Sequence, residues 1–150
     1  MTEESNIFSG SSHLTLPADR KEFPALQQWL LSIAAELDMQ ERIRKQLMIC
    51  CDEIFTNIAS YAYLDGNGSV EITIEFVAET QSLRILFSDS GTAFNPLEIS
   101  EPDTSSALSE RKIGGLGLFM VKKMMDSVEY CRQDGKNILT LTKCLEKQDK

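Results

Sequence analysis

Apolar residues recur every three or four positions along two stretches of the first half of the chain, which is the spacing of one face of an α-helix. The first stretch begins at Pro24, which suits a first helical turn because the N–H that proline lacks is not needed there. Its apolar positions are Leu26, Trp29, Leu30, Ile33, Ala34 and Leu37. The second stretch runs from about Gln40 to Tyr63, with Ile43, Leu47, Cys51, Ile54, Ile58 and Ala62 in one stripe. The pattern predicts two consecutive amphipathic helices.

Alternating apolar and polar residues predict strands elsewhere in the chain. Residues 70–76 alternate cleanly, and residues 83–87 form a more apolar run typical of a buried strand. Two further strands are expected at 128–132 and 138–142, joined by a turn at Asp134-Gly135. His13 to Leu16 alternate weakly and end at Pro17, which is typical of a short edge strand.

A long polar segment, residues 95–112, precedes a third apolar helix that opens with the glycine-rich sequence GGLG at 114–117. So long a loop inside a compact domain is usually either functional or a sign that an element has been assigned wrongly. The predicted order is one strand, two helices, two strands, the loop, one helix and two strands. This order predicts an α+β two-layer sandwich, in which about three helices cover one face of a mixed, mostly antiparallel β-sheet.

The length of 150 residues is sufficient for one compact domain with a proper core. We expect this domain at residues 12–145, between a flexible N-terminus (1–11) and a C-terminal tail (146–150). The net charge of −8 disfavours a generic grip on nucleic acid or on an anionic membrane, because both need clustered basic residues. Lys122-Lys123 is the nearest local basic patch, and a solvated helix face explains it better.

The start of the chain does not have the pattern of a signal peptide, and no apolar run approaches the roughly 18 residues of a membrane span. The four cysteines are Cys50, Cys51, Cys131 and Cys144. They form no CxxC pair and accompany no histidine cluster that would indicate zinc. We therefore expect reduced, mostly buried thiols in a cytoplasmic protein.

The glycines of GGLG need a reason, because each costs a helix roughly 1 kcal/mol relative to alanine. The sequence lacks the preceding strand and the spacing of a dinucleotide-binding turn, and it lacks the Gly-Lys-Ser/Thr of a Walker loop. A backbone that approaches phosphates at a helix N-terminus is the remaining functional interpretation. A tightly packed loop-to-helix junction is the structural alternative.

Two further polar groupings carry possible chemistry. Glu53 and Asn57 are four residues apart in the second predicted helix, so their side chains share one face. An amide oxygen there can hold Mg²⁺ while the carboxylate accepts a proton, although an exposed helix face produces such pairs too. Asp89, followed by Gly91, ends a predicted strand: this is either a turn or a carboxylate presented to an exocyclic amine.

Three segments in this order resemble a known family: DEIFTN (52–57), DSGTAF (89–94) and GGLGLFMVKKMMD (114–126). They are similar to the motifs of the ATP-binding domain shared by gyrase, heat-shock chaperone, histidine-kinase and MutL proteins. More narrowly, the chain resembles the anti-sigma factor serine/threonine kinases of bacteria. The resemblance spans about residues 10–145, and it implies the histidine-kinase-like ATPase fold.

For the phosphate end of the site, the resemblance implies that Asn57 ligates Mg²⁺ and that Glu53 is the general base. The segment 95–112 would form a lid over ATP with a hinge at Gly114. The residues expected to line the phosphates through their backbone are Gly115, Leu116 and Gly117. Either Arg111 or Lys112 would reach the γ-phosphate.

For the base end of the site, the resemblance implies that Asp89 accepts the adenine amino group. Gly91 would make room for the ring, Phe94 would lie nearby, and Thr140 would assist Asp89 through its hydroxyl. The chain departs from many family members at Tyr61, where those members carry histidine.

The resemblance implies an ATP-dependent serine/threonine protein kinase that phosphorylates a small antagonist (anti-anti-sigma) protein. The same domain would sequester a sigma factor or similar regulator in a partner-switching pathway, without touching nucleic acid or membrane directly. A histidine kinase is disfavoured because the only histidine, His13, lies in a predicted strand. The alternative is a non-catalytic ATP-binding module that switches between protein partners. Since relatives often dimerise, the resemblance also suggests a homodimer.

Overall fold

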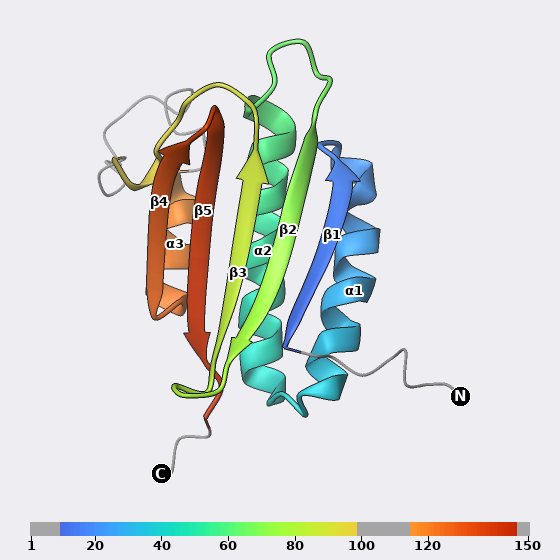
Figure 1. Ribbon diagram of the computed structural model, residues 1–150, viewed down its shortest axis with the longest axis vertical. Coiled ribbons are helices and arrows are strands. Elements are labelled where there is room, and N and C mark those ends of the chain that lie inside the picture. Colours follow the sequence, from blue (N-terminus) through green and yellow to red (C-terminus); the bar gives the residue numbers. More distant parts are fainter. Residues whose placement is uncertain (1–9, 99–114, 147–150) are drawn as a thin grey trace.

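A five-stranded β-sheet forms one layer of the protein, and three helices cover one of its faces (Figure 1). The structure is a computed structural model, and it describes residues 10–98 and 115–146. The expected two-layer α+β architecture is therefore confirmed. No helix within the described ranges is long and apolar enough to cross a membrane.

The elements follow the order expected from the sequence. The strands are β1 (Ser11–Pro17), β2 (Ser69–Val77), β3 (Ser82–Asp89), β4 (Ser127–Gln133) and β5 (Lys136–Cys144). The helices are α1 (Phe23–Glu36), α2 (Glu41–Tyr61) and α3 (Gly115–Met124), with short 3-10 turns η2 (Arg20–Glu22) and η3 (Pro96–Glu98). Most boundaries lie within about two residues of the expected ones.

The strand order across the sheet is β1-β2-β3-β5-β4, and every neighbouring pair is antiparallel. The sheet is thus antiparallel throughout, where the sequence pattern predicted a mostly antiparallel one. β5 lies between β3 and β4, and its pairing places Asn137 opposite Asp89. The β4–β5 hairpin turns at Asp134-Gly135, whose φ angles of 54° and 76° are those of a tight hairpin turn.

The core lies between the helices and the inner face of the sheet. Alternate strand residues point toward the helices, since side chains alternate across a strand. Fully buried examples include Ile72, Ile85 and Phe87 in the sheet and Leu30 and Phe55 in the helices. The opposite face of the sheet is polar and carries ion pairs such as Glu75–Arg84, at 2.7 Å. This one-sided burial fixes which strand residues face α2.

The cysteines divide into two pairs. Cys50 and Cys51 are buried in α2, whereas Cys131 is exposed and Cys144 is partly exposed. The expectation of mostly buried thiols is therefore wrong for Cys131 and Cys144, whose positions along β4 and β5 alternate with the residues that face the helices. Burial raises the pKa of Cys50 to about 11 and raises the pKa of Cys51 still further.

These differences predict selective alkylation by iodoacetamide at pH 8. Cys131 should react readily, while Cys50, with about one thiol in a thousand ionised and no solvent access, should react only after unfolding in urea. Since the folded state keeps Cys50 protonated to higher pH than the unfolded state does, the free energy of unfolding should fall from pH 9 toward 11. Peptide mass mapping measures the labelling, and equal rates at Cys50 and Cys131 would contradict the described packing of α2.

Candidate functional site

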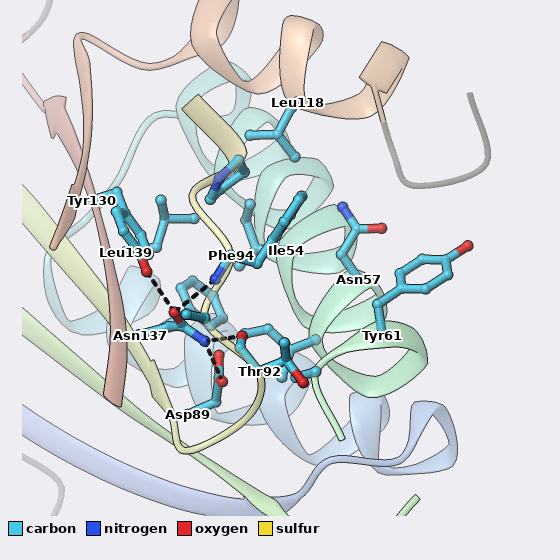
Figure 2. Close-up of a pocket in the computed structure, with 15 residues that line it drawn as sticks. Ile54, Asn57, Tyr61, Asp89, Thr92, Phe94, Leu118, Tyr130, Asn137 and Leu139 are labelled. Atoms are coloured by element: carbon cyan, nitrogen blue, oxygen red, sulfur yellow. Dashed lines mark hydrogen bonds between the residues drawn. The ribbon is translucent and has the colours of Figure 1, made fainter. Parts of the chain in front are cut away.

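A cavity of about 300 Å³ opens between α2, α3 and the end of the sheet where β3 finishes (Figure 2). Its walls are largely apolar, and a few polar side chains are set into them. The lining residues that matter most here are Ile54, Asn57, Tyr61, Asp89, Thr92, Phe94, Leu118, Tyr130, Asn137 and Leu139. Such a slot, apolar with few polar groups, suits a flat organic ring.

Asp89 is the carboxylate of this cavity. It is the last residue of β3, and only 6% of its surface is exposed. Its Oδ1 accepts hydrogen bonds from Gly91 N at 2.9 Å and from Asn137 Nδ2 at 3.0 Å. Both bonds reach the same oxygen, so Oδ2 retains acceptor capacity for a molecule in the cavity.

Asn137 holds the turn that follows Asp89. Its Nδ2 also donates to Thr92 O at 2.9 Å, and its Oδ1 accepts from Phe94 N at 3.2 Å and from Tyr130 Oη at 2.6 Å. The amide therefore uses both donors and both acceptor lone pairs within the protein. Asn137 is not among the site residues predicted from the sequence, where its only signal is a polar residue in phase with Leu139 and Leu141, just after the Asp134-Gly135 turn.

Thr140, the residue expected to assist Asp89, points the other way. Side chains alternate along β5, so Asn137, Leu139 and Leu141 are buried toward the helices while Thr140 lies on the opposite face. Thr140 pairs with Leu86 of β3, three positions from Asp89. The expectation for Thr140 is wrong, and Asn137 is the β5 residue that bonds to Asp89.

The C-terminal end of α2 supports the same turn from the other side. Ala62 O accepts a hydrogen bond from Thr92 N at 2.8 Å, and Tyr63 Oη accepts one from Ser90 N at 2.8 Å. A Cβ at Gly91 would overlap the Ala62 carbonyl, which is fixed backbone. Gly91 is therefore required by the close approach of Ala62, and the expectation that it makes room for a ring stays a prediction.

Arg132 of β4 completes the support by donating from Nη1 to Gly91 O at 3.0 Å. Segments far apart in the sequence thus hold residues 89–94 in one conformation. Because these hydrogen bonds all join atoms of the protein, the protein's own contacts organise this end of the cavity.

Glu53 and Asn57 lie on one face of α2, as their spacing predicts. Asn57 Nδ2 donates to Glu53 Oε2 at 3.0 Å, which leaves Asn57 Oδ1 available as a ligand for a cation. Asn57 lines the cavity, and Figure 2 shows it on α2 beside Tyr61. The described part of the chain holds no group of three or more acidic, histidine or cysteine side chains placed for a metal.

Gly117 lies against this pair. A Cβ at Gly117 would overlap the carboxylate of Glu53, so the absence of a side chain lets α3 approach α2. A second contact follows further along, where Cys50 Sγ lies 3.8 Å from Met124 Sδ. A side chain at Gly117 would thus meet the Glu53 carboxylate first, and the expected role of Gly117 at the phosphates stays a prediction.

Of the other site residues predicted from the sequence, three lie within the described part of the chain and three lie outside it. Phe94 lines the cavity and is 42% exposed. Gly115 and Leu116 form the first turn of α3. Arg111, Lys112 and Gly114 lie outside the described residues.

The chain matches the sequence model of the histidine kinase-like ATPase domain over residues 16–143. It is 34% identical over 115 residues to the serine/threonine-protein kinase BtrW of Bordetella bronchiseptica, covering 76% of this chain and 80% of that protein. It is 31% identical over 140 residues to the serine-protein kinase RsbW of Listeria monocytogenes, covering 90% and 88% respectively.

Two solved structures share the fold. One holds the RsbU and RsbW domains of a Mycobacterium tuberculosis protein: the TM-score is 0.66 at 17% identity, over 93% of this chain and 34% of that one. The other is the SiaB–SiaC complex of Pseudomonas aeruginosa. The TM-score is 0.58 at 15% identity, and the match covers 88% of this chain and 88% of the matched chain. The chain belongs to the histidine kinase-like ATPase domain family and, within it, to the anti-sigma factor kinases, which are protein serine/threonine kinases.

Proposed function

We propose that this protein binds Mg-ATP in the cavity beside α2 and transfers the γ-phosphoryl group to a serine or threonine of a small anti-anti-sigma protein. One observation carries the proposal: a single cavity is lined both by a buried carboxylate, Asp89, and by Asn57, whose amide donates a hydrogen bond to Glu53. The first suits a base with an exocyclic amine, and the second suits a metal-bound triphosphate and a hydroxyl nucleophile.

The base end would recognise adenine by shape and by one charged hydrogen bond. Apolar side chains such as Ile54 and Leu139 line the slot and exclude water from the ring faces. Asp89 Oδ2 would accept a hydrogen bond from an N–H of the exocyclic amine. A hydrogen bond to a charged group contributes about 1.5–3 kcal/mol. The support of residues 89–94 by the protein means that little ordering is needed when the ring enters.

The phosphate end fits Mg²⁺ by the chemistry of its donors. Asn57 Oδ1 is an uncharged oxygen left free by the bond from Asn57 Nδ2 to Glu53. Mg²⁺ is commonly held by one or two protein oxygens, together with water and substrate phosphates. When bound, the ion would neutralise charge on the triphosphate.

Glu53 would act as the base for the attacking hydroxyl. In the transfer, the hydroxyl oxygen forms a bond to the γ-phosphorus, the bond from that phosphorus to the bridging oxygen breaks, and ADP leaves. The hydroxyl proton passes to Glu53, whose position is set by Asn57 and by the contact with Gly117. Arg111 or Lys112 would supply positive charge at the γ-phosphate.

The relatives support the choice of partner. Two are a serine/threonine-protein kinase and a serine-protein kinase of similar length, and one structural neighbour was solved in complex with a second protein, SiaC. We infer that this chain alternates between a substrate antagonist and a sequestered sigma factor or similar regulator, as a homodimer in the cytoplasm.

Nucleotide binding is tested by thermal melting with and without Mg-ATP. At about 100-fold excess over Kd, binding should add about 2.7 kcal/mol and raise the Tm by several degrees. Asp89→Asn should lose this shift, because it replaces the Oδ2 acceptor with an amide donor while Oδ1 can still accept from Gly91 and Asn137. Thr140→Ala, on the opposite face, should keep the shift. An unchanged Tm for wild type at millimolar ATP would contradict the proposed nucleotide site.

Phosphoryl transfer is tested with Glu53→Gln. Small anti-anti-sigma proteins of the same organism are incubated singly with enzyme and Mg-ATP, and intact-mass spectrometry follows phosphate addition. Glu53→Gln should bind ATP normally but transfer the phosphoryl group at least about a hundredfold more slowly, since the glutamine amide cannot take up the hydroxyl proton. The neighbouring exposed acid provides a control, Asp52→Asn, which should behave as wild type. Equal transfer by Glu53→Gln would exclude this residue as the base, and no transfer by wild type would favour the non-catalytic module.

Gly117→Ala should separate stability from activity. Alanine favours the helix by roughly 1 kcal/mol, and the overlapped atoms are the movable end of Glu53, so the Tm should be unchanged or higher. The displaced carboxylate should slow transfer at least tenfold by the same general-base argument, with no further loss in a Glu53→Gln background. By contrast, Gly91→Ala meets fixed backbone and should lower the Tm. Undiminished transfer by Gly117→Ala would show that this contact does not position Glu53.

A further inference from the structure

We propose that Asn137 is the positioning residue that makes Asp89 selective for a purine with an exocyclic amine, and that Tyr130 holds the Asn137 amide in the orientation this requires. The inference rests on the proposed ATP site and deepens it. Asn137 would act through Asp89 and would not touch the nucleotide.

The hydrogen bonds of Asn137 leave it nothing to offer a ligand. Nδ2 donates to Asp89 Oδ1 and to Thr92 O, at 3.0 and 2.9 Å. Oδ1 accepts from Phe94 N and from Tyr130 Oη, at 3.2 and 2.6 Å. All four positions of the amide are therefore used, at a residue that is only 7% exposed.

These bonds also determine which way the amide faces. Reversing it would place Nδ2 against the N–H of Phe94, donor against donor, and Oδ1 against Asp89 and Thr92 O, acceptor against acceptor. Tyr130 adds a short bond to the correct oxygen. The amide is thus held in the one orientation that presents a donor to Asp89.

That donor in turn determines how Asp89 faces the cavity. With Oδ1 occupied by Gly91 N and Asn137 Nδ2, the carboxylate is held against rotation about its own axis, and Oδ2 is the oxygen left for a ligand. An amine presents an N–H to this oxygen, whereas a hydrogen atom on the ring carbon presents no comparable donor. Selectivity for the amine therefore depends on the Asp89 orientation that Asn137 maintains.

The strand register explains why this residue occupies the position. Asp89 and Asn137 are direct partners in the β3–β5 ladder. The tight turn at Asp134-Gly135 sets where β5 begins, and a one-residue slip would turn every β5 side chain to the other face. Lys136 and Ile138, the neighbours of Asn137, lie on the opposite face of the strand.

The test compares binding of Mg-ATP with binding of the triphosphate of purine riboside, which lacks only the 6-amino group, by titration calorimetry. Wild type should prefer ATP by about 10–100-fold, the value of one hydrogen bond to a charged group. Asn137→Leu, of similar size but without donors, should weaken ATP binding about tenfold or more while changing binding of the analogue far less. The preference of Asn137→Leu for ATP over the analogue should fall toward that of Asp89→Asn, which lacks the Oδ2 acceptor.

Tyr130→Phe removes only the hydroxyl that bonds to Asn137 Oδ1, and it keeps the test valid if Asn137→Leu does not fold. It should lower the preference for ATP by a smaller factor, about two- to fivefold, as expected for one neutral hydrogen bond acting indirectly. Thr140→Ala, from the other face of β5, should leave the preference unchanged.

Each other outcome contradicts a different statement. Equal weakening of ATP and analogue in both Asn137→Leu and Tyr130→Phe would reduce Asn137 to general structural support and overturn the inference. A wild type that binds both compounds equally would show that Asp89 does not select the amine, although a nucleotide site would stand. A wild type that binds neither would overturn the proposed function together with this inference.

Discussion

Burying a carboxylate is costly unless hydrogen-bond donors replace the lost water, and the arrangement around Asp89 follows from that constraint. Its donors come from the turn after β3 and from β5: Gly91 is only two residues away, whereas Asn137 meets Asp89 because the two strands pair in register. Arg132 of β4 and the end of α2 then hold the same turn through Gly91 and Thr92. The base end of the cavity is therefore complete only when β4 and β5 are paired into the sheet.

The phosphate end depends on a different contact, between two helices. Glu53 and Asn57 are on the rigid inner length of α2, and α3 reaches them because Gly117 has no side chain. A pair placed on a helix is held more firmly than one placed on a loop. The two ends of the cavity thus have separate supports, so substitutions at one end should leave the other largely intact.

A single domain of this kind suits regulation by exchange of partners. The nucleotide would occupy the space between α2 and the sheet, leaving the polar outer face of the sheet uninvolved. Under the proposed function, phosphorylation of one partner would decide whether the other is released.

Local patterning in the sequence was sufficient for the elements and for some of the site. Helical spacing predicted α1 and α2, and alternation or a short apolar run predicted the strands. An i,i+4 spacing placed Glu53 beside Asn57, and each of these signals is contained within one element. The three ordered motifs indicated the family. The antiparallel class of the sheet followed largely from the order of those elements.

Tertiary structure alone decided which distant residues meet. Asn137 and Thr140 are both polar residues of one strand, and only the register against β3 shows that Asn137 faces Asp89 while Thr140 faces away. Likewise, the neighbours of Gly91 and Gly117 are Ala62 and Glu53 of α2, which no local pattern connects to them. The physical reason is that spacing along one element fixes its faces, whereas contacts between elements depend on how strands pair and helices pack.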